Sequence, residues 1–413
     1  MPDPLPVRRR LHIRAFSWSL RTLQNAKLMT PLLDFEKLLQ TAQRRTGLTN
    51  FGDTAFHGPL RRLLESCRNE ARLNSIGKLV CAEDILQLLS NRLQIQRDSE
   101  KWPYIAGQKI ERPLFITGLP RSGTTLLHNL LAQDDREFCA PATWEVMFPS
   151  PPPFAGQDNG PRIKRAGANL AFFNLLVPEF RKIHPISAYF PQECVAILSH
   201  SFMSDQFDTM FNIPAYQSWL EQQDMRPAYA YHRQFLQHLQ YGAPMRRFVL
   251  KAPNHMFSVE ALFAIYPDAQ IIQTHRDPME VLPSIASLMT VMRSAFSDSV
   301  DTAAIGSEMI RFWKETLEQF LNARKNLAGG SVYDARFADL VRDPIAVVRE
   351  LYRELGQNFA ARAEGRMRTF LSRHPNGRHG NHSYAMDSFG LDPAEINQRF
   401  DLYRRRFGLT NLG

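Results

Sequence analysis

The 413-residue sequence is poor in cysteine and lacks any long hydrophobic run. Its four cysteines are widely spaced and form no C-x-x-C pair, which argues against a disulfide framework or a zinc site and favours a reducing compartment. No apolar run approaches the roughly 20 residues that a membrane-spanning helix needs. The first residues, MPDPLPVRRR, lack the apolar region of a signal peptide. These absences predict a soluble, cytoplasmic protein without a membrane span and without a metal site.

The net charge of +9 raises the question of nucleic-acid binding. Non-specific nucleic-acid binders concentrate lysine and arginine on one face, together with aromatic side chains that stack on bases. Here the basic residues are dispersed, and the denser runs Arg8–Arg10 and Arg404–Arg406 stand at opposite ends of the sequence. We interpret Arg404–Arg406 as the solvated face of an amphipathic helix. We therefore expect no nucleic-acid partner, and a basic surface that favours a small anionic ligand.

The most informative segment, residues 113–131, reads PLFITGLPRSGTTLLHNLL. It predicts a short buried strand at 114–117, a loop at 118–125, and a helix with an apolar stripe. Glycines at both ends of such a loop let backbone N–H groups and a helix N-terminus face a phosphate-like anion. The spacing matches a P-loop, except that Thr124 stands where a nucleotide triphosphatase has lysine. The cation is Arg121, inside the loop, so the pattern disfavours a magnesium-bound nucleoside triphosphate.

A second anion site is predicted near residue 276. The apolar segment 270–274 indicates a buried strand, which runs directly into His-Arg-Asp-Pro-Met-Glu. Asp277 is a good N-cap, Pro278 suits the first helical position, and Glu280 completes a capping-box arrangement. Arg276 is thereby placed between the carboxyl end of a strand and a helix N-terminus, where open α/β sheets bind ligands. Ser284 lies two turns into the same helix and can face the same anion.

Together, these motifs resemble the cofactor site of the sulfotransferases that use 3′-phosphoadenosine 5′-phosphosulfate (PAPS). The resemblance runs from about residue 113 to the C-terminus and is closest to bacterial-type members with a helical N-terminal extension. It implies PAPS as co-substrate, with no metal required. The 5′-phosphosulfate would be bound by Arg121, Ser122, Gly123, Thr124 and Thr125, and the 3′-phosphate by Arg276 and Ser284. The segment R-F-A-D-L resembles one that lies near the adenine and implicates Phe337, whereas the basic loop 373–382 implicates Arg378, His379 and Gly380.

Sulfuryl transfer also needs a general base for the acceptor hydroxyl. His255, in VLKAPNHMF, resembles the histidine that follows a strand-terminal lysine in cytosolic sulfotransferases, and Glu145, in APATWEVMF, resembles the glutamate of tyrosylprotein sulfotransferases. Structural alternatives are a helix-entry residue for His255 and a first-turn helix acid for Glu145. His184 is a third candidate. The resemblance assigns Lys251 to neutralising charge on the transferring group.

The alternation of apolar strands and helices after residue 113 predicts an α/β fold, a P-loop-like parallel sheet flanked by helices. Residues 1–112 are expected to form a helical extension, with helices at 35–45, 59–79 and 83–93, and residues 113–413 the sulfotransferase-like domain. The stretch 141–245 is rich in aromatics and proline. We expect most of it to be core, and part of it to form a site for a hydrophobic alcohol, phenol or lipid-like acceptor.

The sequence thus predicts a sulfotransferase that transfers a sulfuryl group from PAPS to an acceptor hydroxyl. One alternative is a P-loop phosphotransferase that uses Mg-ATP, which would require a lysine at position 124 and an acidic residue that ends a strand. The other is a non-catalytic nucleotide-binding protein of the same fold. The oligomeric state is left open.

Overall fold

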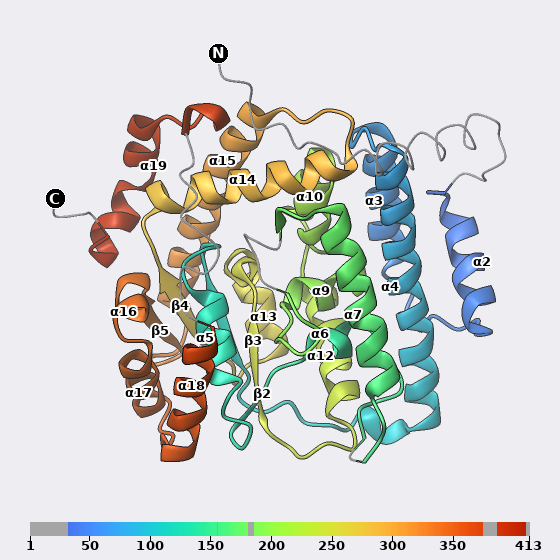
Figure 1. The fold of residues 1–413 in the computed structure, drawn as a ribbon, viewed down its shortest axis with the longest axis horizontal. Helices are drawn as coiled ribbons and strands as arrows, with labels where there is room; N and C mark the ends of the chain where they lie inside the picture. The colour runs from blue at the N-terminus through green and yellow to red at the C-terminus, as the bar shows by residue number, and fades with distance from the viewer. Residues whose placement is uncertain (1–31, 155, 181–185, 375–385, 410–413) are drawn as a thin grey trace.

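A five-stranded parallel sheet organises the computed structural model, which describes residues 32–154, 156–180, 186–374 and 386–409. The strand order is β2-β3-β1-β4-β5, and every neighbouring pair is parallel (Figure 1). The strands are β1 (Leu114–Gly118), β2 (Phe138–Cys139), β3 (Arg247–Lys251), β4 (Gln270–His275) and β5 (Val332–Arg336). The predicted α/β class is therefore confirmed, although β2, only two residues long, was not foreseen.

The central strand β1 is buried along its whole length, and its side chains alternate between two cores. Leu114 and Ile116 pack on one face against helices that include α5, whereas Phe115 points to the other face and joins a larger cluster. The first face is covered by α5 (Thr124–Leu131), α16 (Phe337–Arg342), α17 (Pro344–Glu354) and α18 (Ala361–Arg373). The larger cluster includes side chains of α12 (Arg226–Gln240), α13 (Val259–Ile265), α14 (Pro278–Phe296), α15 (Thr302–Ala323) and α19 (Pro393–Phe407).

The helices that precede the sheet share this larger core. They are α2 (Phe35–Thr46), α3 (His57–Asn69) and α4 (Ser75–Lys101). The predicted break near residue 80 is wrong, because the chain turns earlier: Arg72 has a φ of 44° and Asn74 caps a single 27-residue α4. The Asn74 N–H donates to Phe296 O of α14 at 2.9 Å, and a Cβ on Gly77 would lie 2.0 Å from the same oxygen. The boundary expected at residue 112 stays a prediction.

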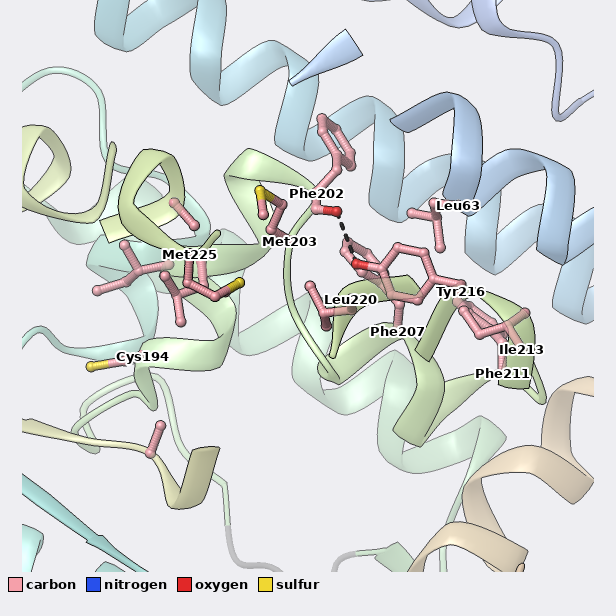
Figure 2. Packing of buried hydrophobic residues seen from close by; sticks show 14 of the residues in the cluster. Leu63, Cys194, Phe202, Met203, Phe207, Phe211, Ile213, Tyr216, Leu220 and Met225 are labelled. Atoms are coloured by element: carbon pink, nitrogen blue, oxygen red, sulfur yellow. Dashed lines mark hydrogen bonds between the residues drawn. The ribbon is translucent and has the colours of Figure 1, made fainter. Parts of the chain in front are cut away.

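The aromatic middle region consists mainly of short helices that pack inward, together with one 17-residue helix that is largely exposed. They are α6 (Thr143–Met147), α7 (Gly160–Leu176), α9 (Cys194–Leu198), α10 (Gln206–Met210) and α11 (Pro214–Leu220). Figure 2 shows Phe202, Phe207 and Tyr216 packed together beside Leu63 of α3, with the Tyr216 hydroxyl donating to Phe202 O at 2.8 Å. These aromatics are core, as expected for most of the region.

Short 3₁₀ segments complete the described chain: η1 (Pro103–Ile105), η2 (Ser199–Ser201), η3 (Pro253–Ser258), η4 (Arg324–Asn326) and η5 (Met386–Phe389). Within the described ranges, no helix has both the length and the apolar character that crossing a bilayer would require.

Candidate active site

The loop between β1 and α5 is a tightly folded anion cradle. Gly118, Arg121 and Gly123 have φ angles of 135°, 66° and 92°, so the chain turns through left-handed conformations that favour glycine. A Cβ on Gly118 would lie 2.4 Å from Thr274 O of β4, which shows how closely the loop is packed on the neighbouring strand. Arg121 is the residue without this freedom, and its positive φ marks a locally strained position in the predicted cofactor loop.

The side chain of Ser122 holds this loop in place. Its hydroxyl lies 2.5 Å from Leu119 O and 2.5 Å from the Thr274 hydroxyl, and the residue is fully buried. Immediately after it, Gly123 is the N-cap residue of α5, which begins at Thr124 without a side-chain cap. The first N–H groups of a helix lack intrahelical partners and attract anions. The predicted loop thus offers a helix N-terminus at Thr124 and Thr125 for an anionic group.

Arg276 lies against this loop, although it is 155 residues further along the chain. Its Nη1 donates to Arg121 O at 2.9 Å, and its Nη2 donates to Glu280 Oε2 at 2.7 Å. The guanidinium stacks on the ring of Phe337, 4.1 Å from the centroid. The structure therefore brings together three residues that the sequence analysis assigned separately to cofactor contacts.

Helix α14, which follows Arg276, begins largely as predicted. Asp277 is the N-cap and its carboxylate accepts from the Met279 N–H at 3.0 Å. Glu280 does not complete a capping box, because its carboxylate is engaged by Arg276. Ser284 is buried two turns into the helix. Arg404, expected to be solvated, instead binds the Asp277 carboxylate at 2.9 Å with its side chain 17% exposed.

A buried charged cluster lies at the carboxyl end of β3. Lys251, the last residue of the strand, forms an ion pair with Glu193, and their side chains are 3% and 19% exposed. Lys251 Nζ also donates to the Thr125 hydroxyl at 3.3 Å. This contact connects the cluster to the first turn of α5, so Lys251 is next to the anion cradle, as the resemblance implied.

Glu193 was missed from the sequence. It follows Phe-Pro-Gln in a proline-rich stretch and matches no motif, and its partner Lys251 lies 58 positions further along the chain. Asp205 adds a second carboxyl group near the pair. Burial, helped by the charge of Glu193, raises the pKa of Asp205 to about 7. A carboxyl group with such a shift, close to one member of a buried ion pair, is typical of functional sites.

His255 lies beneath this cluster, in the hydrophobic core. Its Nδ1 is hydrogen-bonded to the Tyr229 hydroxyl at 2.7 Å, and its ring packs edge-on against Phe115 at 4.9 Å. Burial lowers the pKa of His255 well below its ordinary value, so the ring is neutral near pH 7. Its Nε2 is buried and has no hydrogen-bond partner among the described residues.

Glu145 lies elsewhere, at the edge of the sheet. Its carboxylate accepts the Ala142 N–H at 2.7 Å at the start of α6, the arrangement expected of a first-turn helix acid. Burial raises the pKa of Glu145, against the opposing charges of Arg162 and Arg246. Arg246 precedes β3 and Lys251 ends it, so about 15 Å of strand separates the two ends.

The remaining predicted residues fall outside the described ranges. Arg378, His379 and Gly380 of the basic loop, and His184, belong to these segments, so their roles stay predictions. In the part of the chain that the structure describes, no three histidine, cysteine, aspartate or glutamate side chains are grouped to hold a metal ion.

Comparison with known proteins agrees with this geometry. Residues 113–361 match the model of the Sulfotransferase family. The omega-hydroxy-beta-dihydromenaquinone-9 sulfotransferase Stf3 of Mycobacterium bovis is 23% identical over 303 residues, which cover 70% of this chain and 74% of the relative. The protein of that name from Mycobacterium tuberculosis matches to the same extent.

Two solved structures share the fold over nearly the whole chain. Sulfotransferase STF1 from Mycobacterium tuberculosis superimposes with a TM-score of 0.80 at 29% identity, over 90% of this chain and 99% of that chain. Sulfotransferase STF9 from Mycobacterium avium gives a TM-score of 0.80 at 26% identity, over 91% and 97% of the two chains. This chain belongs to the Sulfotransferase family, and the sulfotransferase activity expected from its sequence is confirmed.

Proposed function

We propose that this sulfotransferase takes its sulfuryl group from PAPS and transfers it to a hydroxyl of a hydrophobic, lipid-like acceptor. The observation that carries the donor assignment is the hydrogen bond from Arg276 Nη1 to Arg121 O. It puts a cation suited to a 3′-phosphate beside a helix N-terminus suited to a 5′-phosphosulfate. The acceptor class is supported by the name of the Stf3 relatives, which denotes a hydroxylated menaquinone.

The residues present fit a nucleotide with two anionic ends. The uncapped N-terminus of α5 and Arg121 would hold the phosphosulfate, and Arg276, with Ser284 further along α14, would hold the 3′-phosphate. Phe337 already packs on Arg276, and its half-buried ring offers a flat apolar surface for the adenine. When bound, PAPS supplies an activated sulfuryl group whose leaving group is a phosphate.

Transfer forms a bond from the acceptor oxygen to sulfur as the bond from sulfur to the phosphate oxygen breaks. Lys251 lies beside Thr125 in the first turn of α5, where its ammonium group can stabilise negative charge on the departing phosphate oxygen. The acceptor hydroxyl loses its proton in the same step. Glu193 is the carboxylate in contact with Lys251, and we assign it the role of proton acceptor.

We place Glu193 ahead of His255 and Glu145, the two candidate bases from the sequence that lie within the described residues. His255 borders the same cluster, but its ring is fully enclosed in the core, where Tyr229 holds it through Nδ1. Glu145 caps α6 at the level of the amino end of β3. A general base must reach the reacting hydroxyl directly or through one water, and Glu193 is the best placed of the three.

Thermal unfolding with adenosine 3′,5′-bisphosphate tests the donor site. A ligand at about 100 times its dissociation constant adds roughly 2.7 kcal/mol to the free energy of unfolding, and the midpoint should rise visibly. Arg276→Ala should abolish this shift. Arg368→Ala is the matched control, because Arg368 also pairs with a glutamate at a spacing of four residues, Glu364, but lies outside the site. A shift with Mg-ATP and none with the bisphosphate would overturn the proposal.

A further inference from the structure

A cavity of about 520 Å³ lies beside the edge strand β2, within the usual size range of small-molecule sites. It has no role in the donor site described above. More than half of its lining residues are aromatic, proline or other apolar side chains, among them Phe138, Phe190, Phe248, Phe370, Pro141 and Pro191, and the rest include the charged residues Asp135, Glu145 and Arg246. Tyr189, 70% exposed, lies on its lining toward solvent.

The cavity exists because β2 is so short. Its two residues pair with Arg247 and Phe248, so among the described residues no strand lies beside the rest of β3 on that edge. Beyond Cys139 the chain instead pairs with the segment that precedes Glu193: Thr143 N–H donates to Phe190 O at 2.9 Å, and Gln192 N–H donates to Pro141 O at 2.8 Å. These backbone bonds build a rigid wall along the cavity.

Three segments that line the cavity continue toward the Glu193–Lys251 pair, although neither of these two residues lines it. Pro191 lines the cavity, and two residues later Glu193 contacts Lys251. On α5, the cavity residue Asn129 lies one turn below Thr125 and donates to its carbonyl oxygen at 2.8 Å. Along β3, Phe248 precedes Lys251 by three residues, or about 10 Å of strand. A molecule whose hydroxyl group meets Glu193 can therefore extend its other end into the cavity.

The lining favours an apolar chain with a polar group at a defined position. The apolar part of the wall rewards removal of hydrocarbon surface from water. The polar and charged lining residues, Gln133, Asp135, Glu145, Gln240, Arg246 and His374, leave room for a polar group as well. Asn129 is 7% exposed, and its Oδ1 is buried without a hydrogen-bond partner among the described residues. Buried polar atoms are rarely left unpaired in native proteins, so this oxygen points to a ligand or water that donates to it.

We propose that this cavity holds the hydrocarbon tail of the sulfuryl acceptor, a long-chain or isoprenoid alcohol, while its terminal hydroxyl lies at the Glu193–Lys251 pair. The inference rests on the proposed function, since it assigns the tail site of that acceptor. It makes cavity size the determinant of acceptor length.

Calorimetric titration with primary alkanols from hexanol to dodecanol tests this tail site. Affinity should rise about fourfold for each added methylene until the cavity is full, and then level off. Ala132→Phe, which fills the cavity from the end of α5, should weaken dodecanol binding at least tenfold. Ala243→Leu fills it from another wall, and serves if the first variant does not fold. Ala168→Phe, on the exposed face of α7, is the matched control and should bind dodecanol like the wild type.

Bisphosphate binding, measured on the same samples, separates the two claims. Wild-type protein that binds the bisphosphate but shows no chain-length dependence, or a folded Ala132→Phe variant that binds dodecanol normally, would overturn the tail site and leave the donor site standing. Wild-type protein that binds alkanols with the expected length dependence but never the bisphosphate would overturn the proposed function, and with it the acceptor assignment.

Discussion

Replacing Glu193 by glutamine should abolish most sulfuryl transfer while leaving donor binding intact. The amide keeps the size of the side chain but cannot accept the proton of the acceptor hydroxyl. A general base contributes roughly 10²- to 10⁴-fold to a rate. We therefore expect kcat to fall by about that factor, equivalent to roughly 3–5 kcal/mol of transition-state stabilisation.

The same substitution should also lower stability, because it leaves the ammonium group of Lys251 buried without its counter-charge. Lys251 is 3% exposed, and removing one partner of a buried ion pair costs about 3–5 kcal/mol. Glu193→Gln combined with Lys251→Met removes both charges and should recover much of the lost stability without recovering activity. Because Lys251 also takes part in transfer, the double variant reports on stability alone, and the role of Glu193 as base is judged from the kcat of the single variant.

The assay is transfer of radiolabelled sulfur from PAPS to a long-chain primary alcohol, with the bisphosphate-induced shift in unfolding midpoint as the binding control. Glu221→Gln is the matched variant: Glu221 is also 19% exposed and pairs with Arg311, remote from the site. It should keep wild-type kcat. If folded Glu193→Gln protein retains more than about a tenth of the wild-type kcat, the assignment of Glu193 as base is refuted, and Glu145 and His255 become the next variants to make.

Three further outcomes are expected. Glu280→Gln should tighten bisphosphate binding by up to about fivefold in titrations at low salt, since it frees Arg276 and removes a negative charge from an exposed pair; weaker binding would contradict this. The folded pKa of Asp205, about 7, exceeds its unfolded value near 3.9, so the folded state keeps a proton that the unfolded state loses and stability falls as pH rises between those values. Asp205→Asn should flatten this fall by up to about 4 kcal/mol in denaturant titrations from pH 4 to pH 8, and an unchanged slope would refute it. Gly118→Ala would put a Cβ 2.4 Å from Thr274 O and should cost at least about 1–3 kcal/mol of stability, and a thermal midpoint equal to the wild type would argue against the close packing of the loop.

The donor half-sites could be predicted from the sequence because each is local. A strand, a glycine-bounded loop and a helix are contiguous from Leu114 to Leu131, and a strand followed by an N-cap and proline marks Arg276. Their order along a parallel sheet then places both at its carboxyl edge. The hydrogen bond between Arg276 and the Arg121 carbonyl is a detail of packing that no local pattern contains.

What the sequence analysis missed depends on contacts between distant segments. Strand β2 exists only because Phe138 and Cys139 pair with the start of β3, and two residues carry no periodicity. Glu193 becomes a candidate functional residue only through its ion pair with Lys251, and the fold brings these two distant residues together. The helix α4 is a different case, because Asn74 is a recognisable N-cap and nothing between it and Trp102 interrupts a helix. The break predicted near residue 80 was therefore a wrong interpretation of a sequence that does contain the signals for one long helix.

The contact between Asn74 and Phe296 has a consequence for how the chain matures. Helix α4 finds part of its packing surface on α14, a segment that is synthesised some 220 residues later. At about 5–20 residues per second, a ribosome needs roughly 10–40 s to produce that partner. During this interval the apolar side chains of α4 that later meet α14 must remain uncovered, on or near the ribosome. We therefore expect the demand for chaperones during synthesis to depend on the distance between these two helices in the sequence. The sheet also forms late, because its strands come from both halves of the chain.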